Sequence, residues 1–152
     1  MTTGFNQLSY RVAAVQEASP EGLVVILYDV LAEDVQRAIN DMRDGSIERR
    51  SSDLKHAMLV LQLLEGSLDM ERGGSAARSL AAFYTYVRRE LLNAQFLNDE
   101  SVLERLMVLI LDVRGAWSAA DAQAAQSNAS QAIDDATGQN DLAGTRTAQW
   151  SA

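Results

Sequence analysis

Residues 54–68 read LKHAMLVLQLLEGSL, and residues 79–92 read SLAAFYTYVRRELL. In both stretches the apolar residues recur at steps of three and four, which places them on one face of an α-helix. The connecting residues 69–75, DMERGGS, contain two glycines that can end a helix in the left-handed conformation, and Ser75 can cap the next helix. A connection this short forces the two helices to lie antiparallel and side by side. The stretch therefore predicts a helical hairpin.

A longer helix is expected before the hairpin, over residues 19–44. Ser19 is a good N-cap, Pro20 suits the first helical position, and Gly45 supplies the stop. Its apolar residues form two neighbouring stripes, one through Leu27 and the other through Tyr28. A peripheral bundle helix needs about one such stripe. The excess must therefore be covered, and a central position in the bundle is the simplest way to cover it.

Together the periodic segments predict an all-α, antiparallel, up-down-up-down four-helix bundle. The expected helices cover residues 19–44, 50–70, 75–97 and 99–120 or a little further, with Asn98 or Asp99 capping the last one. Gly66 is expected inside the second helix, where close approach of another backbone is one reason for a glycine. The bundle as a whole is expected to span residues 19–125.

The two ends of the chain differ from this body. Residues 1–18 are amphipathic but too short to form a stable isolated helix, so they either dock on the bundle as a lid or fray. Residues 126–152 are rich in Ala, Ser, Gln, Asn and Asp, and we expect them to form a low-complexity, disordered tail. Trp150 stands out in that tail as either inert or a small docking residue.

The composition describes one acidic domain. The chain has 152 residues, 47% of them hydrophobic, which is enough for a sizeable core. It has no cysteine, which excludes disulfides and cysteine metal sites. A net charge of −8 argues against nucleic-acid binding, which needs clustered Lys and Arg. The N-terminus has no signal-peptide pattern, and every apolar run is well short of the roughly 20 residues that cross a bilayer. We expect a cytoplasmic protein without membrane insertion.

Patterns for catalysis or metal binding are missing from the sequence. The single histidine, His56, follows Asp53 by three residues on a polar helix flank, whereas a di-metal bundle needs several such contributions. We expect His56 to be a solvated surface residue. Gly73-Gly74 lacks the Lys-Ser/Thr of a phosphate-binding loop. We therefore expect no catalytic residue, metal or cofactor, and no enzymatic activity; a helix laid in an apolar groove is the more plausible ligand.

The order and spacing of several short motifs resemble the flagellar secretion chaperone FliS family. The resemblance runs from Tyr10 to Trp117. It rests on Tyr10, Ala18-Ser19-Pro20, Leu27-Tyr28-Asp29, Ala57, Leu64 to Asp69, Glu71 to Gly74, Leu80, Phe83-Tyr84-x-Tyr86, Leu91, Ala94, and Leu111 through Arg114 to Trp117.

The resemblance implies a cytoplasmic export chaperone. Such a protein would bind the disordered C-terminal region of flagellin, prevent its premature polymerisation and keep it ready for flagellar type III secretion. A bundle with surplus apolar surface suits that task, because a partner that folds on binding needs a large surface to offset its lost entropy. Components of the export apparatus would be further partners, and the free chaperone would be a monomer or a weak dimer.

The surplus apolar surface and the resemblance together predict a cargo groove made by the first three helices. The predicted partner-binding residues are Tyr10, Leu27, Tyr28, Leu31, Leu80 and Tyr84. Leu27 and Leu80 are equally well explained as core residues. Two alternatives stay open: a homo-oligomeric structural bundle that buries the second stripe against a copy of itself, and an adaptor for another exported protein.

Overall fold

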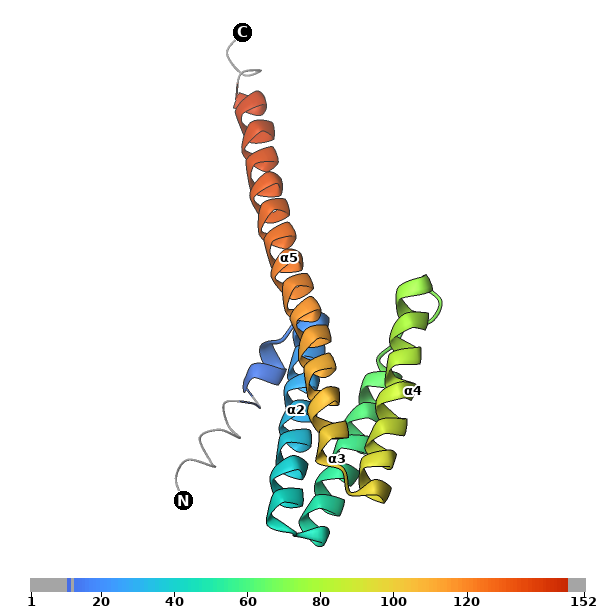
Figure 1. Cartoon of the computed structure of the whole chain (residues 1–152). Helices are drawn as coiled ribbons and strands as arrows, with labels where there is room; N and C mark the ends of the chain where they lie inside the picture. The colour runs from blue at the N-terminus through green and yellow to red at the C-terminus, as the bar shows by residue number, and fades with distance from the viewer. Residues whose placement is uncertain (1–10, 12, 148–152) are drawn as a thin grey trace.

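The computed structural model describes residue 11 and residues 13–147, with side chains described as far as residue 139. Four long helices make up nearly all of this part (Figure 1): α2 (Pro20–Asp44), α3 (Ile47–Gly66), α4 (Gly74–Leu97) and α5 (Glu100–Thr147). A short helical stretch at residues 13–17 precedes α2. No strand occurs among the residues that the structure describes. The predicted all-α fold is therefore confirmed.

Local chemistry explains where α2 begins and ends. The Ser19 hydroxyl accepts a hydrogen bond from the Gly22 backbone N–H at 3.0 Å, and Pro20 occupies the first turn. Gly45 ends the helix in the left-handed conformation, with φ of 72°. The predicted bounds of 19–44 thus agree with the observed Pro20–Asp44 to within one residue.

The hairpin differs from the sequence prediction at its turn. The helix predicted over 50–70 ends at Gly66, which is its last residue rather than an interior one. Apart from its chain neighbours and the adjacent backbone of its own helix, nothing described lies within 4 Å of the position that a Gly66 Cβ would occupy, so close approach of another helix does not explain the glycine. Ser75 lies inside α4 and is not its cap; Gly73 takes the cap position without a side-chain bond. The Asp69 carboxylate orders the turn by accepting backbone hydrogen bonds from Glu71 and Arg72 at 3.1 and 3.0 Å.

The turn between α4 and α5 follows the prediction. Asn98 ends α4 in the left-handed conformation, with φ of 51°. Asp99 accepts hydrogen bonds from the Ser101 backbone N–H at 2.9 Å and from the Ser101 hydroxyl at 2.6 Å, as an N-cap of α5 should. Arg50 of α3 is buried here and donates to the Asn98 side chain. This end of the α3–α4 hairpin is therefore held by polar contacts.

The helices alternate in direction and form the predicted up-down-up-down bundle (Figure 1). The packing of α2 on α3 and on α5 is extensive, whereas α4 packs less extensively on its neighbours α3 and α5. Figure 1 shows why: α4 stays close to α5 near Asn98 but leans away from it towards the α3–α4 turn. The second stripe of α2, which includes Val24, Tyr28 and Val35, is buried in the core. The central position expected for this helix explains its excess apolar surface.

The last helix runs much further than its packing requires. Its buried residues end at Ile110, and every side chain from residue 126 to residue 139 is exposed. Figure 1 shows the helix projecting beyond the bundle. The sequence predicts a helix ending near residue 120 and disorder from residue 126, whereas the structure describes helix as far as Thr147. Alanine-rich composition favours helix locally, but most of the stability of a helix in a protein comes from tertiary packing, which the exposed residues 126–139 lack. The disorder of the tail therefore stays a prediction.

No helix within the described range is both long and apolar enough to cross a membrane. The predicted division of the chain at residues 18 and 125 also stays a prediction. Tyr10, Trp150 and most of the predicted N-terminal segment lie outside the described residues.

Candidate functional site

The structure places the predicted partner-binding residues at two different depths. Tyr28, Leu31 and Tyr84 lie in the core, with at most 1% of each residue exposed. Leu27 and Leu80 are half-buried and pack against that core from outside. Tyr28, Leu31 and Tyr84 therefore do not line an open groove in this structure, and any contact with a partner would require the helices to separate.

Tyr28 and Tyr84 form a hydrogen-bonded pair between α2 and α4. Their phenolic oxygens are 2.9 Å apart, and the ring centroids lie 6.3 Å apart at an interplanar angle of 47°. Burial raises the pKa of the Tyr28 phenol far above its ordinary value; the bond to Tyr84 adds to the rise, and the neighbouring Trp117 side chain opposes it. Burial also raises the pKa of Tyr84. Both phenols are therefore neutral at physiological pH, and they join α4 to the body of the bundle.

A cleft lies where α4 leans away from α5, and we call it the mouth cleft. Its volume is about 370 Å³. It is bounded by the first residues of α2, the α3–α4 turn, the start of α4 and one residue of α5. Its lining residues are Pro20, Glu21, Ser67, Leu68, Asp69, Arg72, Gly73, Ala76, Ala77, Leu80 and Trp117.

The mouth cleft combines an apolar floor with a charged rim. Leu68, Leu80 and Trp117 are partly buried and pack on the core, so the floor is supported from below. Arg72 is exposed at its edge, and Glu21 is half-buried there. A concave apolar surface with a few polar groups at its margin is the usual form of a binding site for a helix or a peptide.

Of the predicted residues, only Leu80 lines the mouth cleft. Trp117 and Leu68 line the cleft but were not among the predicted residues, because in the sequence both simply continue an apolar helical stripe. A large amphipathic residue at the end of a stripe was the available signal for Trp117, since tryptophan is enriched at interfaces. Leu68 lies just beyond the end of α3 at Gly66 and is half-buried.

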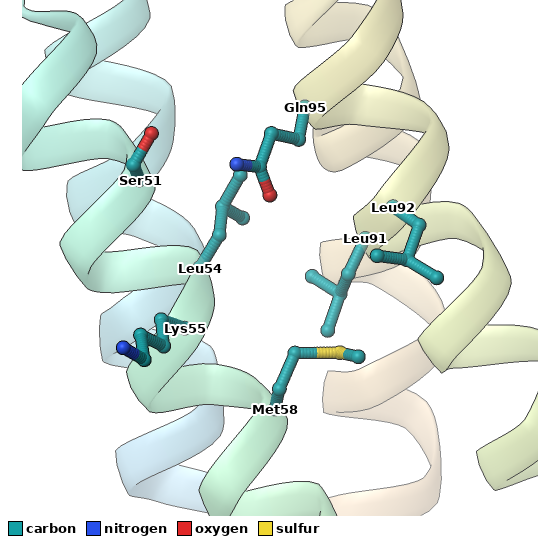
Figure 2. Close-up of a pocket in the computed structure, with 7 residues that line it drawn as sticks. All are labelled: Ser51, Leu54, Lys55, Met58, Leu91, Leu92 and Gln95. Atoms are coloured by element: carbon teal, nitrogen blue, oxygen red, sulfur yellow. The ribbon is translucent and has the colours of Figure 1, made fainter.

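A second apolar surface, which we call the α3–α4 groove, lies at the other end of the hairpin. Its volume is about 410 Å³, and its lining residues are Ser51, Leu54, Lys55, Met58, Leu91, Leu92 and Gln95. Figure 2 shows Leu54 and Met58 on α3 facing Leu91 and Leu92 on α4, with the Gln95 amide reaching towards Leu54. Lys55 lies on the α3 side, pointing away from α4.

Polar side chains gather elsewhere, between α2 and α3. Asp34 is only 1% exposed, and its carboxylate accepts from Arg37 at 2.6 Å and lies 2.6 Å from His56 Nδ1. Burial raises the pKa of Asp53 to about 6, and the neighbouring Asp41 carboxyl group adds to the rise. His56 is exposed as predicted, although Asp34 anchors its ring. Within the described residues no group of three or more His, Asp or Glu side chains is arranged to hold a metal ion.

The chain matches the family model described as Flagellar protein FliS over residues 1–124. A protein of Salmonella typhimurium named flagellar secretion chaperone FliS is 31% identical over 106 residues, covering 69% of this chain and 78% of the relative. The protein of the same name from Escherichia coli is 32% identical over 106 residues, with the same coverage. The one from Bacillus subtilis is 28% identical over 112 residues, covering 74% of this chain and 83% of the relative.

Proposed function

Because this chain belongs to the FliS family of flagellar secretion chaperones, we propose that its cargo is flagellin. It binds the disordered C-terminal region of flagellin in the cytoplasm, prevents premature polymerisation and keeps the subunit ready for type III secretion. Its role as a flagellar export chaperone follows from the family, whereas the identity of the cargo and the binding surface are the substance of the proposal. Components of the export apparatus would receive the loaded complex.

The mouth cleft is the observation that carries this proposal. A flagellin segment that folds into an amphipathic helix could bury its apolar side on Leu68, Leu80 and Trp117. Burial of apolar surface yields about 25 cal/mol per Å², which offsets the entropy that a disordered segment loses on ordering. No nucleotide is needed, because binding energy alone keeps the segment from associating with other subunits.

A block of the mouth cleft tests the proposal without touching the core. Ala76 lines the cleft and is exposed, so Ala76→Arg fills the cleft while keeping a good helix-forming residue. Ala82→Arg is the matched control, because Ala82 is exposed on the same helix and lines neither the mouth cleft nor the α3–α4 groove. Titration calorimetry would use the flagellin C-terminal segment from the same genome.

We expect Ala76→Arg to weaken flagellin binding at least tenfold (about 1.4 kcal/mol) and Ala82→Arg to leave it within about twofold. Both variants should keep the wild-type thermal transition. Equal binding by all three proteins would place the site elsewhere. If the wild-type chain does not bind flagellin at all, the cargo is another exported protein.

The N-terminal segment is part of the proposal as a lid that cargo displaces. Within the described residues, Arg11 pairs with Glu33 of α2, and residues 13–17 line neither the mouth cleft nor the α3–α4 groove. Any covering would therefore come from the residues outside the described range, 1–10 and 12, which include Tyr10. A tethered segment competes with cargo at high effective concentration, so even weak docking would occupy the cargo-binding surface in the free protein.

Deletion of residues 1–17 distinguishes the roles of this segment. A lid predicts stronger binding of a hydrophobic dye and cargo affinity that is unchanged or higher. A direct contact by Tyr10 predicts weaker cargo binding. If dye binding, self-association and affinity all stay unchanged, the segment is a frayed end.

The homo-oligomeric alternative loses its main support in this structure. That alternative needs the second apolar stripe of α2 to be free to contact a copy of the chain. The stripe is instead buried in the core of a single chain. We expect the free protein to be a monomer or a weak dimer, which sedimentation would show.

A further inference from the structure

The hydroxyl group of Ser19 joins the start of α2 to a distant part of α5. Its oxygen accepts a hydrogen bond from the Gly22 backbone N–H at 3.0 Å, and its proton is donated to Asp121 Oδ1 at 2.5 Å. A hydrogen bond from a hydroxyl group to a carboxylate is among the stronger ones in proteins. A Cβ on Gly22 would lie 3.0 Å from the Ser19 hydroxyl oxygen and 3.5 Å from Asp121 Oδ2, so the glycine leaves room for the two side chains to meet.

The Ser19–Asp121 contact lies where α5 leaves the bundle. Figure 1 shows the start of α2 beside α5 at this point. Among residues 118–139 of α5, only Asp121 and Ala124 are half-buried, and the others are exposed. Together with Trp117 they follow the helical spacing of four and three residues, so all three lie on one face of α5. This face therefore packs on the start of α2 even though the fully buried residues of α5 end at Ile110.

The chain also reverses its direction beside this contact. Arg11 pairs with Glu33 of α2, which lies about 20 Å along that helix from Pro20. The stretch that precedes Ser19 therefore runs back along α2. The Ser19–Asp121 contact thus holds the point at which the N-terminal segment turns into the bundle.

We infer that Asp121 is a positioning residue for the mouth cleft, because it holds the α5 side of the cleft against the α2 side. Pro20 and Glu21 follow Ser19 directly and form the α2 side. Trp117, one turn before Asp121, forms the α5 side. Asp121 itself does not line the cleft, so it acts on the site through Trp117. This inference rests on the proposed function and adds a residue that determines the shape of the binding surface.

Loss of the contact should leave the α5 side of the cleft less well fixed. Within the described residues, the bond to Ser19 is the one side-chain hydrogen bond that joins α5 beyond Trp117 to the rest of the bundle. The apparent affinity of a binding site falls in proportion to the fraction of molecules in which the site is assembled. Removal of the Asp121 carboxylate is therefore expected to weaken binding at a surface that Asp121 does not touch.

Fluorescence of Trp117 tests the inference in the free protein. The chain has two tryptophans, so Trp150→Phe leaves Trp117 as the single reporter. In that background, Asp121→Ala should raise the quenching of Trp117 by acrylamide about twofold, because local opening exposes the ring. Asp121→Asn, whose amide oxygen still accepts the Ser19 proton, should behave like the parent protein. Asp134→Ala is the matched control, since Asp134 is exposed on the same helix about 20 Å further out. Equal quenching of Asp121→Ala and Asp134→Ala would overturn the inference.

Titration calorimetry with the flagellin C-terminal segment tests the effect on the cleft. Asp121→Ala should weaken binding about threefold, whereas Asp121→Asn and Asp134→Ala should stay close to wild type. The thermal transition of Asp121→Ala should remain cooperative, because Ser19 still caps α2. If the two residues act through their mutual contact, Asp121→Ala should cause no further loss of affinity in a Ser19→Ala background. Strictly additive losses would show that Asp121 acts by another route and would contradict the inference.

The outcomes separate this inference from the proposed function. If Ala76→Arg weakens flagellin binding but Asp121→Ala does not, the mouth cleft stands as the cargo site and Asp121 has no positioning role. A rise in quenching with unchanged flagellin affinity would make the Ser19–Asp121 contact purely structural and would also refute the inference. If the wild-type chain fails to bind flagellin, the proposed cargo falls, whereas the quenching of Trp117 in the free protein still decides whether Asp121 holds the α5 side in place.

Discussion

The phenolic oxygens of Tyr28 and Tyr84 lie 2.9 Å apart inside the bundle, where each hydroxyl is shielded from water. The pair joins α2 to α4, the helix that otherwise packs less extensively on its neighbours. Trp117, which lines the mouth cleft, lies close enough to Tyr28 to influence the pKa of its phenol. A substitution in this tyrosine pair is therefore expected to alter the mouth cleft.

Removal of one hydroxyl from this pair should cost more than removal of both. Tyr28→Phe or Tyr84→Phe leaves a buried partner without its bond, at a cost of about 1–3 kcal/mol in the free energy of unfolding. The double variant leaves no orphaned group and should lie nearer the wild type. Urea denaturation of all four proteins measures the coupling. Strictly additive losses would contradict the hydrogen bond as the source of the effect.

Leu31 should behave as a core residue rather than as a surface contact. It is fully buried, so Leu31→Ala is expected to lower the free energy of unfolding by about 2–5 kcal/mol. Leu31→Asp, which would bury a charge, should unfold the bundle. Leu59→Ala is the matched control, because Leu59 is 55% exposed and should change stability by less than about 0.5 kcal/mol. A folded Leu31→Asp variant with weakened cargo binding would instead restore Leu31 as a contact.

The carboxyl group of Asp53 should make stability fall as pH rises. Burial raises its folded-state pKa to about 6, above the unfolded value of about 3.9. Between about pH 4 and 6 the folded state therefore binds more protons than the unfolded state, and the free energy of unfolding declines across that window. Above pH 6 this contribution is constant. The decline is at most about 3 kcal/mol, and less in practice because 22% of the Asp53 side chain is exposed.

Asp53→Asn provides the measurement of that effect. The variant removes the titrating group but keeps the shape of the side chain, so it should gain stability relative to wild type as pH rises from 4 to 6. Asp44→Asn serves as a control for an exposed carboxylate at the end of α2. Parallel pH profiles for Asp53→Asn and wild type would show that Asp53 ionises as an ordinary carboxyl group.

The outer part of α5 should exchange its amide hydrogens rapidly. Residues 126–139 are exposed and pack on nothing, so helix there is only marginally stable. Hydrogen exchange should show little protection beyond residue 126 and strong protection around Leu103 to Ile110. Removal of residues 126–152 should leave the thermal transition of the bundle unchanged. Protection beyond residue 126 that matches the bundle would contradict the predicted disorder.

The sequence by itself determined the helical class, the number of long helices and most of their bounds. Those features depend on local chemistry: Ser19 and Pro20 start α2, Gly45 ends it, and Asn98 with Asp99 separates α4 from α5. Such signals act within a few residues and are readable without any tertiary contact. The motif spacing also identified the family, which the match over residues 1–124 confirms.

Only the tertiary structure decided which apolar residues are core and which are surface. Leu27 and Tyr28 are neighbours on adjacent stripes, yet Tyr28 is fully buried and hydrogen-bonded to Tyr84 of α4, whereas Leu27 is half-buried at the edge of the core. The mouth cleft exists because α4 leans away from α5, and the angle between two helices depends on how side chains distant in sequence interlock. Helical periodicity specifies a face but not the partner that covers it, so the position of Trp117 and Leu68 at the mouth cleft became visible only in the structure.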